Sequence, residues 1–129
     1  MRIFYDADAD LNLLRGKKVA VIGYGSQGHA QAQNLRDSGV EVIVAERPGI
    51  PNYEKAKEDG FSPVNARQAA ESADIVQILT EDHAQAYLYR EDVSPFMKAG
   101  KTLLFSHGFN IHFGQITRRS GDLLRLRRR

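Results

Sequence analysis

The sequence predicts an α/β fold built on a doubly wound parallel sheet. Strand and helix signals alternate along the 129 residues, which is the order that a parallel sheet with crossover helices requires. The run 75–79 is almost continuously apolar, as in a strand that is covered on both faces. A glycine-rich turn lies directly between the first apolar run and the first helical stretch. The length suits one domain with its own core.

Each expected element has a local signal. Apolar runs predict strands, and capping residues mark the helix starts. Pro63 places a short third strand at an edge of the sheet, because proline offers no N–H to a ladder. The strands are expected over residues 18–22, 40–45, 61–64, 75–79 and 102–106. The helices are expected over residues 29–36, 53–59 (capped by Asn52), 66–72 (opened by a capping box of Asn65 and Gln68) and 83–89, with another start at Ser94 that Gly100 ends.

The turn after the first strand has the pattern G-x-G-x-x-G of a dinucleotide-binding fold, which makes the predicted sheet Rossmann-type. Gly23 allows the tight turn, Gly25 lets the backbone approach a pyrophosphate, and Gly28 lets the helix lie close to the sheet. The amino end of the helix offers free N–H groups and a positive dipole end to the anion. We expect this turn to bind a dinucleotide, and a plain structural turn is the alternative.

Composition excludes several kinds of site. Without cysteine, the chain has no disulfide, thiol nucleophile or cysteine metal site. No apolar run approaches the ~18–20 residues of a membrane helix, and residues 1–6 do not resemble a signal segment, so we expect a cytoplasmic protein with no membrane partner. The alternating Asp6, Asp8 and Asp10 lack the glycine and glutamate of a calcium loop, and a solvated helix start is expected there.

The positive charge of the chain is confined to its last residues. Residues 117–129 contain six arginines and one aspartate, so they carry +5, and the preceding residues carry −3 of the overall +2. A basic arm can bind nucleic acid, but no aromatic platform or recognition motif accompanies this one, and we expect no nucleic-acid partner. We interpret 117–129 as a solvated or non-native segment in which Leu123, Leu124 and Leu126 form one short amphipathic turn.

Two longer strings resemble ketol-acid reductoisomerase, also called acetohydroxyacid isomeroreductase. They are G-Y-G-S-Q-G-H-A at residues 23–30 and S-H-G-F-N-I-H-F-G-Q at residues 106–115. The likeness runs from Phe4 to Ile116 without a gap. It implies an NAD(P)-binding Rossmann domain over residues 1–116, followed by a basic tail, residues 117–129, that is unlike the family.

The resemblance implies an enzyme of branched-chain amino-acid (valine, isoleucine and leucine) biosynthesis. The family takes a 2-acetolactate-type substrate through a magnesium-dependent alkyl migration, and then reduces the product with a nicotinamide cofactor to a 2,3-dihydroxy acid. A helical carboxy-terminal domain supplies the family's magnesium ligands, so we expect a chain truncated before that domain and without a metal site. Alone it should bind cofactor with little or no turnover, and the full-length enzyme should be a homo-oligomer. A stand-alone NAD(P)-binding regulatory module is the alternative.

Carried over to this sequence, the family's functional residues fall into three groups. The pyrophosphate loop is matched by Tyr24, Gly25, Ser26 and Gln27. A second cofactor-contacting turn is matched by Asp82, His83, Ala84 and Gln85, although the family usually shows Pro-Asp-Glu/Gln where this chain has Glu-Asp-His. His107 matches the active-site histidine, whose imidazole can donate a hydrogen bond to, or exchange a proton with, a substrate oxygen. For the other histidines we expect surface or structural roles: His29, His83 and His112.

The loop after the second strand bears on the choice of cofactor. An acidic residue at this strand end binds the ribose 2′-hydroxyl of NAD, whereas a nearby arginine accommodates the 2′-phosphate of NADP. This chain has both, Glu46 and Arg47. Ile50 and Asn52 stand where NADPH-preferring members of the family carry serines, and a carboxylate near a 2′-phosphate is repulsive. The family implies NADPH, while a preference for NADH, or use of both cofactors, stays open.

Overall fold

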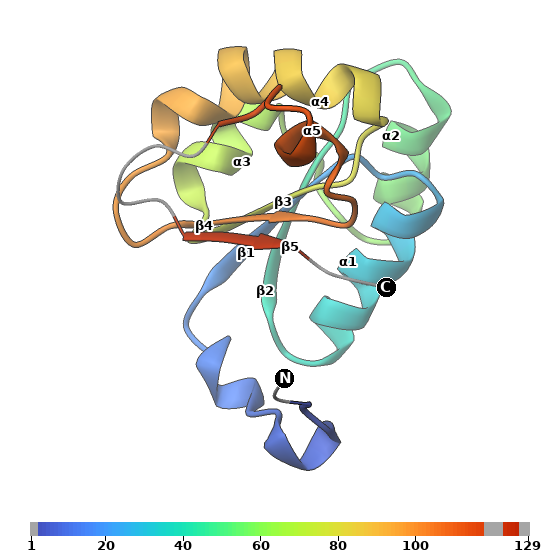
Figure 1. Cartoon of the computed structure of the whole chain (residues 1–129). Coiled ribbons are helices and arrows are strands. Elements are labelled where there is room, and N and C mark those ends of the chain that lie inside the picture. Colours follow the sequence, from blue (N-terminus) through green and yellow to red (C-terminus); the bar gives the residue numbers. More distant parts are fainter. Residues whose placement is uncertain (1–2, 118–122, 127–129) are drawn as a thin grey trace.

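A parallel sheet lies at the centre of the fold in the computed structural model, which describes residues 3–117 and, by their backbone, 123–126. Its five strands follow the order β2-β1-β3-β4-β5 (Figure 1). Val19 on β1 lies opposite Val42 on β2 and Ile75 on β3, so β1 is paired on both sides. The strands are β1 (Lys18–Ile22), β2 (Glu41–Ala45), β3 (Ile75–Ile78), β4 (Thr102–Phe105) and β5 (Leu123–Leu126).

Helices cover both faces of the sheet. On one face lie α1 (Ser26–Asp37) and α2 (Pro51–Glu58). On the other lie α3 (Ala66–Ser72), α4 (Asp82–Leu88) and the short α5 (Phe109–His112) (Figure 1). A π-helical turn, Tyr89–Val93, and a 3₁₀ turn, Ser94–Phe96, continue α4, and two further 3₁₀ turns, Asp6–Asp8 and Leu11–Leu13, precede β1.

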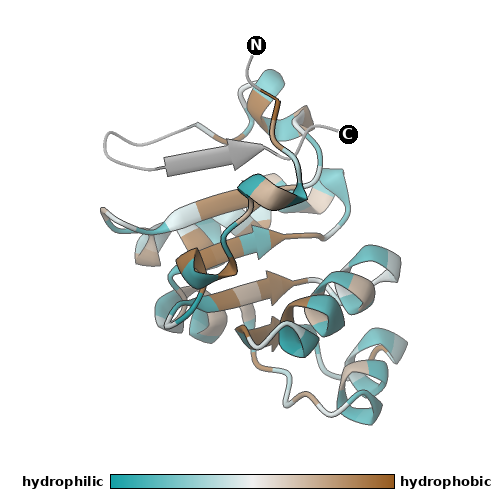
Figure 2. Ribbon diagram, turned by 90° about the horizontal axis from the view of Figure 1, so that it is seen from below, coloured by the Kyte–Doolittle hydropathy of each residue, from teal (hydrophilic) through white to brown (hydrophobic). Residues whose placement is uncertain are grey.

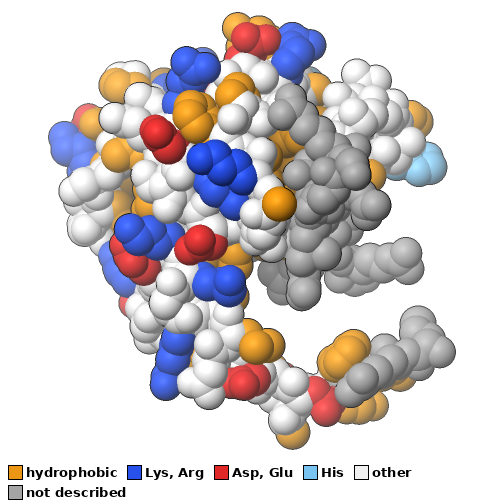
Figure 3. Space-filling view, turned by 90° about the vertical axis from the view of Figure 1, so that its left-hand side faces the viewer, with side chains coloured by type: hydrophobic (Ala, Val, Ile, Leu, Met, Phe, Trp, Pro, Cys, Tyr) orange, Lys and Arg blue, Asp and Glu red, His pale blue; other side chains and the backbone are white. Residues whose placement is uncertain are grey.

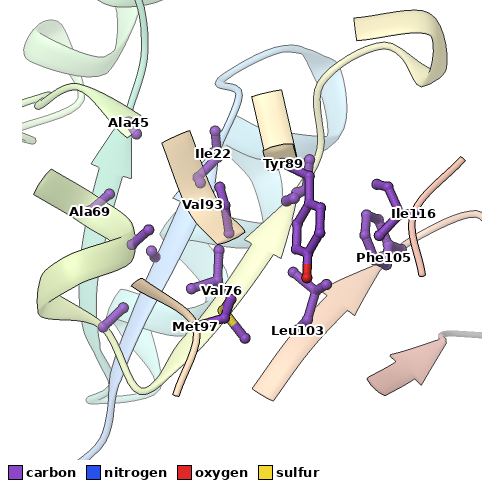
Figure 4. Packing of buried hydrophobic residues seen from close by; sticks show 14 residues of the cluster. Ile22, Ala45, Ala69, Val76, Tyr89, Val93, Met97, Leu103, Phe105 and Ile116 are labelled. Atoms are coloured by element: carbon purple, nitrogen blue, oxygen red, sulfur yellow. The ribbon is translucent and has the colours of Figure 1, made fainter. Parts of the chain in front are cut away.

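Two clusters of buried apolar side chains hold these layers together, one on each face. Under α1 and α2, Val21 and Val44 of the sheet meet Ala32 of α1 and Ala56 of α2. On the opposite face the larger cluster contains Ala20, Ile22, Ala69, Val76, Tyr89, Val93, Met97, Leu103, Phe105 and Ile116 (Figure 4). The apolar strands therefore lie between helices whose outer faces are polar, as Figure 2 shows. Burial on both faces explains why the strands read as continuous apolar runs.

The expected strands at 18–22, 40–45, 75–79 and 102–106 are confirmed to within one residue at each end. The strand expected at 61–64 is wrong, since only an isolated bridge between Val64 and Ala45 forms there. Pro63 has no N–H to donate, which prevents a longer ladder. The first helix begins at Ser26 rather than at residue 29, because Gly25 already takes the N-cap position. The helix expected from Ser94 to Gly100 is a single 3₁₀ turn, Ser94–Phe96.

The amphipathic turn expected for Leu123, Leu124 and Leu126 is also wrong. These residues belong to β5, which pairs in parallel with β4 and places Leu124 opposite Leu103. A short apolar run fits a strand as well as a helical turn, and only the partner strand decides between them. The other residues of the predicted basic tail from 118 onward, 118–122 and 127–129, lie outside the described part of the chain.

An amino-terminal arm, residues 3–15, projects from the body of the domain (Figure 3). Asp10 caps its second 3₁₀ turn by accepting a hydrogen bond from the backbone N–H of Asn12 at 2.9 Å. Several apolar side chains of the arm are exposed: Ile3, Phe4, Tyr5, Leu11 and Leu13. Among the described residues, no helix has the length and apolar character needed to cross a bilayer.

Candidate functional site

A cleft of about 1020 Å³ opens at the carboxyl ends of β1, β2, β3 and β4. This is the edge at which open α/β sheets bind their ligands. It brings together thirteen of the residues that the sequence singled out: Gly23, Gly25, Ser26, Gln27, Glu46, Arg47, Ile50, Asn52, Asp82, His83, Ala84, Gln85 and His107. Tyr24 and Gly28 do not line the cleft, and both are buried.

The three glycines of the turn differ in the space that surrounds them. Gly23 has φ +99° and lies so close to the next strand end that a Cβ would be 2.9 Å from the Thr80 nitrogen. A Cβ on Gly28 would overlap the carbonyl oxygen of Gly23, so only glycine lets α1 approach the sheet there. Gly25 is the reverse case, because a Cβ on it would meet no protein atom within 4 Å. Its bare backbone faces open space in the cleft.

The first turn of α1 borders the same space, since Ser26 and Gln27 line the cleft. Gly25 is the N-cap of α1, and no side chain caps this end of the helix. The unpaired N–H groups and the positive end of a twelve-residue helix together favour an anion such as a pyrophosphate. His29 is half-buried and has a structural contact, because its Nδ1 lies 2.9 Å from the Gly25 carbonyl oxygen.

The buried side chain of Tyr24 attaches the glycine turn to the end of α2. Its side chain is 1% exposed, and its hydroxyl donates to Oδ2 of Asp59 at 3.0 Å. The ring of Tyr24 packs edge-on against the ring of Phe61, with 5.7 Å between the ring centroids. Burial and, to a lesser degree, the hydrogen bond to Asp59 raise the pKa of Tyr24 to about 12. The ion pair with Lys55, at 2.7 Å, lowers the pKa of Asp59. The side chain of Tyr24 therefore points toward the carboxyl end of α2 and not into the cleft.

Glu46 is fixed at the end of β2 by two backbone N–H groups. Its Oε2 accepts from the N–H of Tyr24 at 2.8 Å, and its Oε1 accepts from the N–H of Arg47 at 2.9 Å. The carboxylate thus lies directly beside the glycine turn of residues 23–28. Each oxygen keeps a further lone pair, so both can still accept hydrogen bonds from hydroxyl groups of a ligand.

The rest of this loop leads into α2. Arg47 is exposed at the rim of the cleft, and Ile50 and Asn52 are partly buried on its wall. The helix begins at Pro51 with Ile50 as N-cap, so the expectation that Asn52 caps it is wrong. Proline is favoured in the first turn because its fixed φ suits the helix and its missing N–H is not needed there.

The turn after β3 forms the opposite wall. Asp82 begins α4, and the side chain of His83 is 80% exposed, 3.4 Å from Glu81. Gln85 is buried, and its Nε2 donates to the Thr80 carbonyl at 2.8 Å. Its amide therefore holds the turn together from within, while His83 has the surface position that the sequence suggested.

His107 follows β4 and lies exposed at the same wall. His112 lies at the last position of α5, and its ring packs against Phe113 at 4.8 Å, away from the cleft lining. Sequence reasoning missed two neighbouring hydroxyls, Thr80 and Ser106, which line the cleft. Both Oγ atoms are buried without a hydrogen-bond partner among the described residues. A signal for them is present in the sequence, because both lie within two residues of the carboxyl end of a strand, at the edge where open α/β sheets bind ligands.

These features fit a dinucleotide. The cleft runs from Glu46 after β2, past the amino end of α1, to His107 after β4, and it offers in turn a hydroxyl acceptor, an anion site and polar groups. A metal site is a different matter. In the part of the chain that the structure describes, no three His, Asp or Glu side chains gather closely enough to hold a metal ion.

Comparisons with known proteins agree with this geometry. Residues 13–123 match the sequence profile of the acetohydroxy acid isomeroreductase NADPH-binding domain. The chain is 44% identical to an NADH-preferring ketol-acid reductoisomerase from an uncultured archean, with a TM-score of 0.92, and the match covers 98% of this chain and 40% of that one.

More distant structures share the fold alone. A putative oxidoreductase from Jannaschia sp. CCS1 is 20% identical with a TM-score of 0.73, and an NAD-binding semialdehyde dehydrogenase protein from Cupriavidus necator is 20% identical with a TM-score of 0.75. For both, the match covers 85% of this chain and 40% of the other. The extent of the profile match and the identity over nearly the whole chain show that this protein belongs to the ketol-acid reductoisomerase family and carries its amino-terminal NAD(P)H-binding domain.

Proposed function

We propose that this chain binds the nicotinamide cofactor of a ketol-acid reductoisomerase and prefers NADH to NADPH. The observation that carries the preference is the fixed carboxylate of Glu46. Because two backbone N–H groups hold it, the carboxylate does not swing aside to admit a 2′-phosphate. The ribose 2′-hydroxyl of NADH can instead donate to it. The NADH preference of the archaeal relative supports the same choice.

Other residues supply binding and orientation. The backbone around Gly25 and the amino end of α1 hold the pyrophosphate. Arg47 remains at the rim, where its guanidinium can stack on the adenine. The bound nicotinamide supplies the hydride. His107, at the far end of the cleft, donates a hydrogen bond to the substrate oxygen or exchanges a proton with it.

For the whole enzyme we propose the reaction that the family membership implies. A 2-acetolactate-type substrate undergoes magnesium-dependent alkyl migration and reduction to a 2,3-dihydroxy acid, in the biosynthesis of valine, isoleucine and leucine. The described residues do not fit a magnesium site, so no step of that migration is assigned to them. The chain spans 40% of the length of the archaeal relative, and the part assigned here is cofactor binding.

The test is a fluorescence titration of the purified chain with NADH and with NADPH in moderate salt. We expect saturable binding of both, with a dissociation constant about tenfold or more lower for NADH, which corresponds to about 1.4 kcal/mol. Equal affinities, or tighter binding of NADPH, would contradict the preference. Binding of neither would contradict the cofactor-binding function itself.

The variant Glu46→Gln tests whether the negative charge of Glu46 causes the preference for NADH. It keeps one oxygen to accept from the Tyr24 N–H, gives up the bond from the Arg47 N–H and removes the repulsion, so the NADH-to-NADPH preference should fall toward unity. Glu81→Gln is the matched control, because Glu81 lines the other wall of the same cleft and its loss changes the net charge equally. The control should keep the preference of the unmodified chain.

A further inference from the structure

Two buried amides join the loop after β3 to the loop after β4. Asn110 in α5 and Gln85 in α4 are each 3% exposed. The Nδ2 of Asn110 donates to the Asp82 carbonyl at 2.8 Å and to Oε1 of Gln85 at 3.0 Å. The Nε2 of Gln85 in turn donates to the Thr80 carbonyl at 2.8 Å, which links both amides to the turn after β3. We call this pair, Asn110 and Gln85, the amide clamp.

Asn110 also closes its own loop. Its carbonyl accepts from the N–H of Ile116 at 3.0 Å, and Ile116 is buried in the larger apolar cluster. The helix α5 has only four residues, so it has little stability of its own. The position of His107, three residues before Asn110, therefore depends on the amide clamp and not on a rigid helix.

The strand order indicates which part of a bound dinucleotide would lie next to the amide clamp. Glu46 follows β2, at one edge of the sheet, whereas His107 and the turn beginning at Thr80 follow β4 and β3 on the other side of β1. A dinucleotide with its adenosine ribose at Glu46 and its pyrophosphate at α1 places its nicotinamide between the two clamped loops.

We propose that Asn110 is a positioning residue for the nicotinamide end of the cleft. Through Gln85 and the Asp82 carbonyl, it holds the loop of His107 against the turn after β3 at the separation that the nicotinamide half requires. Neither amide has to touch the cofactor to do this, since their polar groups are already bonded inside the protein. The inference rests on the proposed binding of NADH.

The variant Asn110→Asp tests it. The change keeps the shape of the side chain, removes both donors and turns a carboxylate oxygen toward the Asp82 carbonyl and Gln85. The probes are NADH and ADP-ribose, which has the adenosine and both phosphates but lacks the nicotinamide. We expect the NADH dissociation constant to rise about tenfold, and that of ADP-ribose to change by less than about twofold. If Asn110→Asp does not fold, Asn110→Ser removes the same bonds without a buried charge.

Lys101→Met is the matched control. Lys101 also donates to two backbone carbonyls, Ala70 at 2.7 Å and Glu71 at 3.0 Å, but at the amino end of β4, away from the cleft. It should lower the Tm without changing the ratio of the two dissociation constants. Equal weakening of NADH and ADP-ribose in Asn110→Asp would mean a merely structural role and would overturn the proposal, as would unchanged NADH affinity. A wild-type chain that binds ADP-ribose and NADH equally poorly would refute the proposed function, and this inference with it.

Discussion

Gly25 and Gly28 lie three positions apart in one turn, yet the protein has room for a side chain at only one of them. A Cβ on Gly28 would overlap a backbone oxygen, whereas a Cβ on Gly25 would point into the open cleft. The motif thus combines a glycine that the packing requires with a glycine whose missing side chain leaves space in the cleft. The sequence pattern alone does not separate these two requirements.

Alanine substitutions should separate them. Gly25→Ala is expected to fold with nearly unchanged Tm, because its backbone has φ −77°, and to weaken NADH binding about tenfold or more by occupying the space of the pyrophosphate. Gly28→Ala is expected to lose about 1–3 kcal/mol or more of stability through overpacking. Thermal unfolding by circular dichroism and an NADH titration check both variants. A destabilised Gly25→Ala that binds NADH normally would contradict this assignment.

The raised pKa of Tyr24 predicts that the stability of the fold depends on pH in the alkaline range. Its pKa is raised to about 12 in the folded protein, above the ~10 of an unfolded chain. The stability it contributes is therefore fully present below about pH 10 and is lost as the pH rises through about 12. Tyr24→Phe should cost about 1 kcal/mol at pH 7, through the lost bond to Asp59, and should lose less stability than the wild type between pH 7 and pH 11.

Urea unfolding at the two pH values measures this difference. The comparison with Tyr24→Phe cancels the titration of the other tyrosines and of the lysines, which both proteins share. If both proteins lost the same free energy of unfolding on going to pH 11, the hydroxyl of Tyr24 would not be the group responsible.

At the scale of single elements, α3 shows how directly a local signal can define a helix end. Asn65 accepts from the N–H of Gln68 at 2.9 Å, and Gln68 accepts in return from the N–H of Asn65 at 3.3 Å. This capping box was expected from the sequence, and it is confirmed.

Asn65→Ala should lower the free energy of unfolding by about 1 kcal/mol, because the backbone N–H of Gln68 loses its acceptor. Asn34→Ala is a suitable control, since Asn34 is exposed inside α1, where alanine has the higher helix propensity. That variant should be neutral or slightly more stable. Equal destabilisation of both variants in chemical unfolding would argue against the cap.

The elements that sequence reasoning identified are those whose signals are local. Buried strands and the capping box depend on neighbouring residues, so they could be predicted from the sequence. The helix α5 and the strand β5 could not, because each is held by a distant partner: Asn110 by the α4 turn, and Leu123–Leu126 by β4. The composition of the cleft was likewise predictable from strand ends, while the inward orientation of Tyr24 and Gln85 depends on tertiary contacts.

At the scale of the whole molecule, the described residues supply a cofactor cleft and no cluster of metal-binding side chains. We expect the isolated chain to bind NADH, but to turn over acetolactate with magnesium and NADH no faster than a blank. NADH oxidation followed by absorbance checks this. Adding a helical domain of the family type to the same chain should restore turnover. Turnover by the chain alone would refute the expectation, and restoration would argue against a separate regulatory module.

The two bonds that immobilise Glu46 also limit how this protein can change its coenzyme. The carboxylate that we propose to bind the ribose also accepts from the Tyr24 N–H, and so supports the glycine turn beside it. A mutation to a side chain without an acceptor would leave the Tyr24 N–H unpaired and should weaken binding of NADH and NADPH alike, whereas Glu46→Gln keeps that acceptor. A lineage that switched cofactors through a residue without an acceptor at this position would need a second substitution to restore a partner for the Tyr24 N–H, and the two changes should be found together.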